Sequence, residues 1–237
     1  MNTERRRIVM GETCIDAVTD HKYLGKAEAL AAEARTIVTS KIENSPEFGS
    51  SYKPVKSRID DVPLISRMCT ASELAGVGPM ASVAGAVATY VLNGLIRDGC
   101  EYAVLDNGGD VALISDREVF VGLFTGRNDL ECALHLTRTC GILGVCSSSG
   151  TFGHSISFGR SDICSVISED PILADACATR LGNLVSETAD LQPAAEYICT
   201  IKGVKGCIAS IAGNITICGD VPELVSVGQE NHTLEMQ

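Results

Sequence analysis

The residues with the clearest capacity for chemistry lie in an apolar helix that is predicted to begin at Pro171. Asp170 is a favourable N-cap and proline suits the first helical position, so the start of this helix is well defined. The next turns are apolar on nearly every side, which predicts a buried helix. Asp175 lies in its middle, where a carboxylate is costly unless it is paired, hydrogen-bonded or bound to a metal ion.

Thr179 follows Asp175 by one helical turn and places a hydroxyl on the same face. Two oxygen groups on one buried face form half of a site for a hard cation such as Mg²⁺. In a purely structural alternative, the threonine hydroxyl bonds to its own helix and Asp175 bonds to a neighbouring strand. Taken alone, the pair favours this structural interpretation, so the flanking sequence is needed to decide.

Three glycine-bearing turns could bind a ligand beside such a helix. Gly76–Pro79 opens a second apolar helix, whose first backbone N–H groups are free to hold a phosphate. Asn107–Asp110 is a tight hairpin of the Asn-Gly type. Ser147–Gly150 is rich in hydroxyls, and His154 follows it as the nearby candidate for acid–base chemistry. Each is weak evidence by itself, because such glycines usually mark only turns and a lone histidine is usually structural.

The composition limits the classes of protein and partner that the chain can represent. With 237 residues, 45% of them hydrophobic, it can fold around a large core. The net charge is −11 and Arg5–Arg7 is the longest basic cluster, which argues against nucleic acid as a partner. An anionic ligand would need helix N-termini or a metal ion to offset this acidic field.

The cysteines and the N-terminal segment indicate a cytoplasmic protein. The eleven cysteines include no CxxC pair, and their odd number argues against a complete set of disulfides. Most are expected to be small buried residues. Glu12 and Asp16 interrupt the first apolar run, which therefore resembles neither a signal peptide nor a membrane anchor. The segment of residues 77–96 is long enough and sufficiently uncharged to cross a membrane, but its glycine and alanine content predicts a core helix.

Long helices and short hairpins must position these residues. Hydrophobic periodicity predicts helices over residues 24–42, 64–74, 79–98, from 171 onward and 194–201. Strands are predicted over residues 7–18 (with a turn at Gly11), 102–105, 111–114, 118–124, 131–136, 141–146, 155–158, 163–167, 207–211 and 215–218. Residues 44–63 hold three prolines and are expected to form a loop.

The order of these elements predicts the fold class. No alternation of strands and helices of the doubly wound kind is present, and the glycines before Pro79 follow a helix, which argues against a dinucleotide-binding Rossmann domain. Helices combined with hairpins are typical of an α+β protein with a mostly antiparallel sheet and buried helices. Residues 1–237 are expected to form a single domain.

In their order along the chain, the motifs resemble those of the ApbE superfamily, the FAD:protein FMN transferases. The family's glycine-rich helix start is similar to residues 78–83, and its Asn-x-Gly-Gly-Asp hairpin resembles residues 107–110, here one residue shorter. Its Thr-Ser-Gly turn resembles residues 148–150. Its Ala-Asp-Ala-x-Ala-Thr helix is matched fully by residues 174–179, the most specific of these motifs. The whole pattern is closer still to an uncharacterised soluble family of ApbE-like proteins.

The resemblance implies an ApbE-like, T-fold-related architecture and a set of site residues. In the transferases, the Asp and Thr of the matched helix and an alanine carbonyl bind Mg²⁺ beside the FAD diphosphate. By resemblance, these roles fall on Asp175, Thr179 and the backbone of Ala81. The family's His-Ile-Ile-Asp-Pro stretch is matched only at His154, which stays the candidate catalytic residue. The implied ligand-binding residues are Gly78, Pro79, Met80, Asn107, Gly108, Gly109, Asp110, Ser148, Ser149 and Gly150.

Three departures limit what the resemblance implies. Ser82 replaces the family's lysine after the glycine-rich start. The loop after Gly150 is shortened and lacks its Asp-Pro step. The transferase's lipoprotein signal is missing. These differences favour binding of Mg²⁺ and a diphosphate, with FAD as one candidate ligand, over transfer of flavin to a protein threonine.

Three classes of function remain open. The first is a cytoplasmic protein that binds a phosphorylated or flavin-type ligand with Mg²⁺ and, as an enzyme, carries out a diphosphate or nucleotidyl-type reaction. The second is a non-catalytic small-molecule-binding or partner protein. The third is sulfur handling, suggested by the cysteines and by a link of this ApbE-like family to sulfur assimilation, with Cys146 as the residue to test. A homo-oligomer is left open, and no feature favours a membrane partner.

Overall fold

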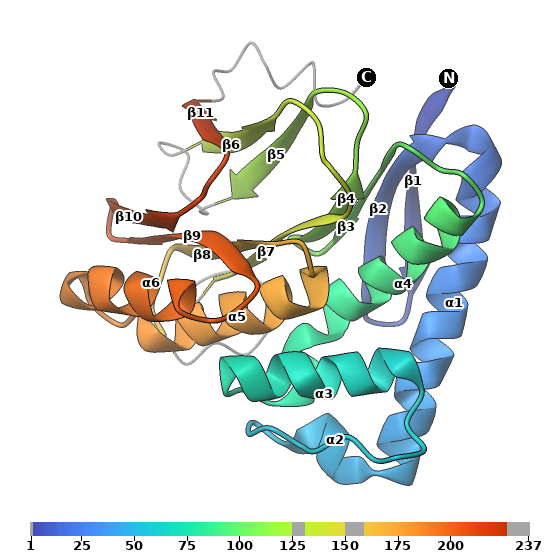
Figure 1. Cartoon of the computed structure of the whole chain (residues 1–237), viewed down its shortest axis with the longest axis horizontal. Coiled ribbons are helices and arrows are strands. Elements are labelled where there is room, and N and C mark those ends of the chain that lie inside the picture. Colours follow the sequence, from blue (N-terminus) through green and yellow to red (C-terminus); the bar gives the residue numbers. More distant parts are fainter. Residues whose placement is uncertain (1, 125–130, 150–158, 227–237) are drawn as a thin grey trace.

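The computed structural model describes residues 2–124, 131–149 and 159–226. Its centre is an eight-stranded sheet in the order β1-β2-β3-β4-β7-β8-β9-β10, in which all neighbouring strands are antiparallel (Figure 1). Its strands are β1 Thr3–Met10, β2 Thr13–Asp20, β3 Ala103–Asn107, β4 Asp110–Ile114, β7 Leu143–Ser148, β8 Ile163–Ser168, β9 Val204–Ile211 and β10 Asn214–Gly219. The predicted α+β class with a mostly antiparallel sheet is confirmed.

A second sheet of three antiparallel strands lies over one face of the first (Figure 1). It contains β5 Val119–Phe124, β6 Glu131–Leu136 and β11 Glu223–Ser226, in the order β11-β6-β5. Side chains such as Val121 and Leu134 pack against Val145 and Ile167 of the large sheet in a separate apolar cluster. The short, half-exposed β11 was not predicted, because its four residues carry no pattern of their own.

The helices cover the other face of the large sheet (Figure 1). They are α1 His21–Asn44, α2 Pro46–Ser50, α3 Pro63–Ala75, α4 Val83–Arg97, α5 Pro171–Leu184 and α6 Leu191–Cys199, with 3₁₀ turns η1 Pro79–Ser82 and η2 Thr188–Asp190. Helices α4 and α5 pack on each other and on the sheet, while α1 and α3 pack on them from outside. The main apolar core therefore surrounds the contact between α4 and α5.

Several predicted boundaries differ from the structure. The helix expected from Pro79 begins as the 3₁₀ turn η1 and becomes α-helical only at Val83. The expected loop over residues 44–63 contains α2, which Pro46 begins and whose Phe48 is fully buried. The opening segment is the hairpin β1–β2, with Gly11 in its turn at a φ of 58°. The strand predicted over residues 155–158 lies outside the described residues.

Among the described residues, one helical segment meets the length and composition expected of a membrane span. It is Pro79–Arg97, and 61% of its most apolar window is buried inside the protein. The segment packs against α1, α5 and β4. Burial of this kind is typical of a core helix, as the sequence predicted.

His135 of β6 contacts acidic residues of the small sheet, among them Glu223 of β11. Its Nδ1 is 3.2 Å from Glu223 Oε2, and its Nε2 is 3.3 Å from Glu118 Oε1. The hydrogen bond with Glu223 raises the pKa of His135, and Glu118 adds to this effect. Because Glu223 begins β11, a protonated His135 ties that strand to the hairpin β5–β6.

We predict that the stabilising effect of His135 declines as pH rises. A raised folded-state pKa means that its contribution is complete below the unfolded-state pKa and is lost as pH rises through the folded-state pKa. Thermal unfolding of the wild type and of His135→Gln should therefore differ more at about pH 5.5 than at about pH 8.5, on either side of the usual histidine range. An equal difference at both pH values would contradict this role.

Candidate functional site

A cavity of about 440 Å³ lies where α2, η1, α4, α5 and β4 meet. Its walls come from segments that are far apart in the sequence, so only the fold brings them together. Apolar and small residues such as Met80 and Val83 form one side. The polar residues on its wall include Ser50, Ser51, Asp110, Asp175, Thr179 and Asn183.

Local sequence explains the position of α5 beside this cavity. The Asp170 carboxylate accepts a hydrogen bond from the Ile172 backbone N–H at 3.0 Å and Pro171 begins the helix, as predicted. Close packing on α4 requires a glycine in that helix. A Cβ atom at Gly85 would lie 2.4 Å from the Pro171 carbonyl oxygen and 2.9 Å from the Asp175 Cβ. The contact of α5 with α4 therefore fixes the Asp175 side chain at the start of α4.

Asp175 caps α4 from the neighbouring helix. Its Oδ2 accepts a hydrogen bond from the Gly85 backbone N–H at 2.8 Å. Ser82, which precedes α4, gives its hydroxyl to the Pro79 carbonyl at 2.8 Å and makes no capping bond. A carboxylate at a helix N-terminus is stabilised by free N–H groups and by the helix dipole. The structural partner of Asp175 is thus a helix start, and not the strand considered in the sequence analysis.

Asp110 and Asp175 form a pair of buried carboxylates at this cavity, 8% and 7% exposed. Burial raises the pKa of Asp175 to about 7, although hydrogen bonds from the Gly85 and Ala84 backbone oppose the shift. Burial also raises the pKa of Asp110 well above its usual range, and the charges of Asp175 and Asp106 add to it. The two carboxylates therefore repel each other when both are ionised.

The described wall supplies nothing to neutralise this pair. No lysine, arginine or histidine is among the described residues that line the cavity. The Oδ1 atom of Asp110 is buried without a hydrogen-bond partner among the described residues. In that part of the chain, no group of three or more His, Cys, Asp or Glu could hold a metal ion. The available donors are two carboxylates with hydroxyl and carbonyl oxygens, which suit Mg²⁺ or Ca²⁺.

The structure brings several of the predicted site residues together and leaves others off the wall. Those around the cavity are Gly78, Met80, Ala81, Asp110, Asp175 and Thr179. Pro79 is buried, and Ser148 is buried with no partner for its hydroxyl among the described residues. Ser149 is described but does not line the cavity. Gly150 and His154 lie outside the described residues, so their predicted roles stay predictions.

Most of the predicted hairpin, Asn107–Asp110, lies beside the cavity and does not line it. The Asn107 side-chain amide donates to the Ala84 carbonyl at 3.2 Å, which links the hairpin to the start of α4. Gly108 and Gly109 have φ values of 74° and 100°, which favour glycine, and neither lines the cavity. Asp110, the first residue of β4, is the hairpin residue that reaches the wall.

Two parts of the wall were missed in the sequence analysis. Asn183 follows Thr179 by one helical turn, so the spacing could have placed it on the same face. Gly49–Tyr52, called the outer wall from here on, lies in a segment that the sequence marked only as a loop. It packs directly on Gly78, where a Cβ atom would lie 1.8 Å from the Ser51 carbonyl oxygen. No local pattern could have shown this long-range contact.

Cys146 lies in the core beside the site and not on the cavity wall. It is fully buried, and its Sγ lies 3.4 Å from the Pro171 carbonyl oxygen. Burial, with the charges of Asp110 and Asp175, raises the pKa of its thiol well above the usual range. A protonated, buried thiol is a poor nucleophile, which weighs against sulfur chemistry at this residue.

Known proteins similar to this chain share its sequence pattern and its fold. A protein family described as AbpE bacteria matches residues 3–198. A UPF0280 protein of Methanothrix thermoacetophila is 41% identical over 205 residues, which are 86% of each chain. Another UPF0280 protein, from Methanocella arvoryzae, is 38% identical over 215 residues, covering 90% of this chain and 88% of the relative.

Two solved structures extend the comparison to three dimensions. The apo form of the flavinyl transferase ApbE of Pseudomonas stutzeri has a TM-score of 0.55 at 11% identity and covers 93% of this chain and 94% of its own. The ApbE protein of Thermotoga maritima has a TM-score of 0.55 at 11% identity, with coverages of 92% and 97%. The expected ApbE-like fold is confirmed.

We predict that Gly85→Ala separates α5 from α4. The added methyl group would clash with the Pro171 carbonyl, and overpacking of this kind costs about 1–3 kcal/mol. The free energy of unfolding in urea should fall by that amount. Gly25→Ala in α1 is the matched control, since its added Cβ would meet no atom within 4 Å apart from the adjacent backbone of its own helix, and alanine is the better helix former. Equal effects of the two substitutions would contradict the role given to Gly85.

Proposed function

Because the chain belongs to the ApbE-like family described as AbpE bacteria and is related to the UPF0280 proteins, we propose that it binds Mg²⁺ and a phosphorylated, flavin-type ligand in this cavity. The observation that carries the proposal is the pair of buried carboxylates, Asp110 and Asp175, on a wall whose described residues include no basic side chain. A bound cation would remove the repulsion within this pair and provide a partner for the Oδ1 atom of Asp110.

The proposed cation ligands come from three elements. Asp175 and Thr179 lie one turn apart on α5, the carbonyl of Ala81 belongs to η1, and Asp110 begins β4. Carboxylate, hydroxyl and carbonyl oxygens are the ligands that hard divalent cations prefer. Because Asp175 is held by its bond to Gly85, the cation would meet a carboxylate that is already positioned.

The proposed organic ligand is anionic at one end and planar at the other. The Gly85 N–H already serves Asp175, so the start of α4 is less available to a phosphate than the sequence suggested. The cation would therefore carry most of the attraction for a diphosphate. Met80, Val77 and Val83 offer apolar cover, and Tyr52 an aromatic face, to a ring such as a flavin. The fold is similar to that of the flavinyl transferase ApbE of Pseudomonas stutzeri, which supports this class of ligand.

When bound, Mg²⁺ supplies charge neutralisation and polarisation of a diphosphate oxygen. The chain's own residues would hold the ion and the ligand in the cavity. His154 remains the proposed acid–base residue for a diphosphate or nucleotidyl-type reaction. The alternative is that the protein is not an enzyme and uses the same cavity only to bind a small molecule or a partner.

Flavin transfer to a protein threonine is not part of the proposal. Ser82 stands where the family has a lysine, and its buried hydroxyl bonds to the Pro79 carbonyl. Because serine carries no amine, this position offers no positive charge to a ligand. We place the protein in the cytoplasm, because all eleven cysteines are free thiols and most of them are buried.

We predict that Asp175→Asn weakens Mg²⁺ binding more than about 10-fold, or about 1.4 kcal/mol, because the ion loses a charged ligand. Asparagine is chosen because it can still cap α4 and so preserve the fold. Calorimetric titration with Mg²⁺, in the presence and absence of FAD, is the measurement. Asp98→Asn, at an exposed carboxylate beyond the far end of α4, is the control. Unchanged Mg²⁺ affinity in Asp175→Asn would rule out the proposed cation site.

We also predict that FAD binds in the presence of Mg²⁺ but is transferred weakly or not at all. The buried Ser82 and the shortened loop after Gly150 are the reasons. The protein is incubated with FAD, Mg²⁺ and a flavin-accepting domain, and in-gel flavin fluorescence is recorded. Strong fluorescence of the acceptor would show that the substitution at Ser82 does not prevent transfer.

A further inference from the structure

The outer wall, Gly49–Tyr52, starts in the last turn of the short helix α2 and continues into a segment without regular structure. Phe48 is fully buried just before it, and the Ser51 N–H bonds to the Glu47 carbonyl at 2.9 Å. Residues 51–62 then form neither helix nor strand, and most of them are exposed. Besides its own local hydrogen bonds, the outer wall is held on Gly78 by contacts of the chain before and after it.

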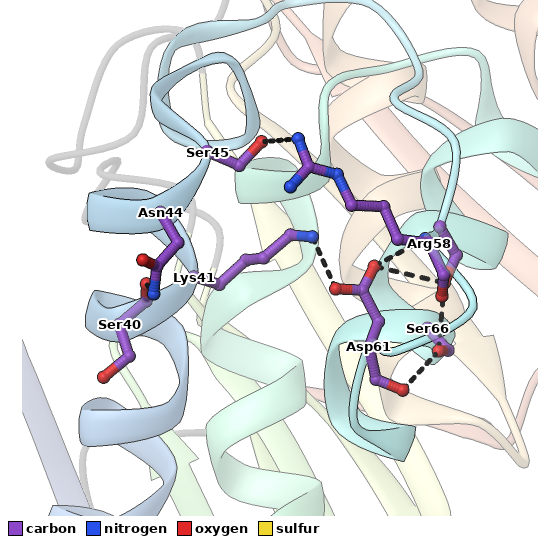
Figure 2. Close-up of polar contacts among 8 residues, drawn as sticks. Ser40, Lys41, Asn44, Ser45, Arg58, Asp61 and Ser66 are labelled. Carbon is purple, nitrogen blue, oxygen red and sulfur yellow. Dashed lines mark hydrogen bonds and ion pairs between the residues drawn. The ribbon is translucent and has the colours of Figure 1, made fainter.

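A buried ion pair fastens the far end of this segment to α1. Lys41 Nζ contacts Asp61 Oδ1, and the two side chains are only 9% and 7% exposed (Figure 2). The same ammonium group lies 5.7 Å from the centroid of the Phe48 ring. One lysine of α1 thus contacts both the apolar anchor that precedes the outer wall and the carboxylate that ends the segment.

Arg58 joins the two ends of the loop. Its Nη2 donates to Ser45 Oγ at 3.3 Å, and its backbone N–H donates to Asp61 Oδ2 at 2.8 Å (Figure 2). Ser66 Oγ donates to the Asp61 carbonyl at 3.4 Å, which ties the same point to α3. Residues 45–61, which include the short helix α2, therefore form a segment whose ends are fastened together, with the outer wall between them.

We propose that Lys41 and Asp61 are positioning residues for the ligand site. They hold the outer wall against Gly78 and so set how tightly the organic part of the ligand is bound, an inference that rests on the proposed function for the identity of the ligand. Neither residue is on the cavity wall. The proposed cation ligands lie on α5, η1 and β4, and none of them is hydrogen-bonded to this network.

The physical basis is the cost of an unpaired buried charge. Removing one partner of a buried pair leaves the other uncompensated, so the segment must move to expose it to water. Movement of the outer wall changes the contact area offered to the ligand, and small displacements of positioning groups have large effects. The carboxylates that would bind the cation stay in place.

The test uses Lys41→Met and Asp61→Asn in the full chain. Affinity for FAD in the presence of Mg²⁺ should fall about 10-fold or more. Affinity for Mg²⁺ alone should stay within about twofold, because the two sites share no partners. Lys41→Arg, which retains the charge, should recover most of the FAD affinity. Lys26→Met is the control. Lys26 also lies on α1, but its contact with Asp98 is more exposed, so this substitution should leave the FAD affinity unchanged.

Hydrogen–deuterium exchange of the ligand-free proteins separates this inference from the proposed function. The Phe48 and Ser51 amides should exchange faster in Lys41→Met, while α5 keeps its protection. If the wild type fails to bind FAD, the proposed function is wrong, yet the exchange result still tests the network. Faster exchange with unchanged FAD affinity would overturn the positioning role. Unchanged exchange at residues 45–61, or faster exchange throughout the protein, would also overturn it.

Discussion

The contact between Asp175 and the start of α4 is the constraint on which the rest of the site depends. Helix α4 begins without a side-chain cap from its own sequence, and the carboxylate from α5 accepts the Gly85 N–H. For this bond to form, the two helices must approach so closely that a side chain at Gly85 would clash. The close packing of α4 on α5, the cap on α4 and the position of Asp175 at the cavity therefore depend on one another.

This arrangement explains how a carboxylate can be buried and still remain available. The helix dipole and two backbone N–H groups favour the ionised form of Asp175, while burial favours the neutral form and raises its pKa to about 7. Asp110 has no such helix start to stabilise it, and the charge of Asp175 raises its pKa further. One oxygen of this pair, Oδ1 of Asp110, has no hydrogen-bond partner among the described residues, and strongly shifted carboxylates of this kind are typical of functional sites.

The extent to which the site could be predicted from sequence follows from the range of its interactions. Asp170, Pro171 and the apolar turns after them act within one helix, so α5 was predicted with its cap. The hairpin at Gly108 depends on its own backbone angles and was also predicted. The cap from Asp175 to Gly85 and the contact of Ser51 with Gly78 join distant segments, and no periodicity encodes them. The short strand β11 was missed for a similar reason, since it forms only by pairing with β6.

The cavity consequently has two parts that are held by different forces. The inner part consists of α4, α5 and β4, whose close packing surrounds Asp110 and Asp175 with the apolar core. The outer wall consists of the end of α2 and the first residues after it, and polar contacts fasten the segment that contains it to α1 and α3. Substitutions in the inner part must preserve close helix packing, whereas the outer wall can change in sequence as long as its fastening is kept. If the proposed cation site is correct, a fold built in this way could keep that site while the outer wall changes in sequence.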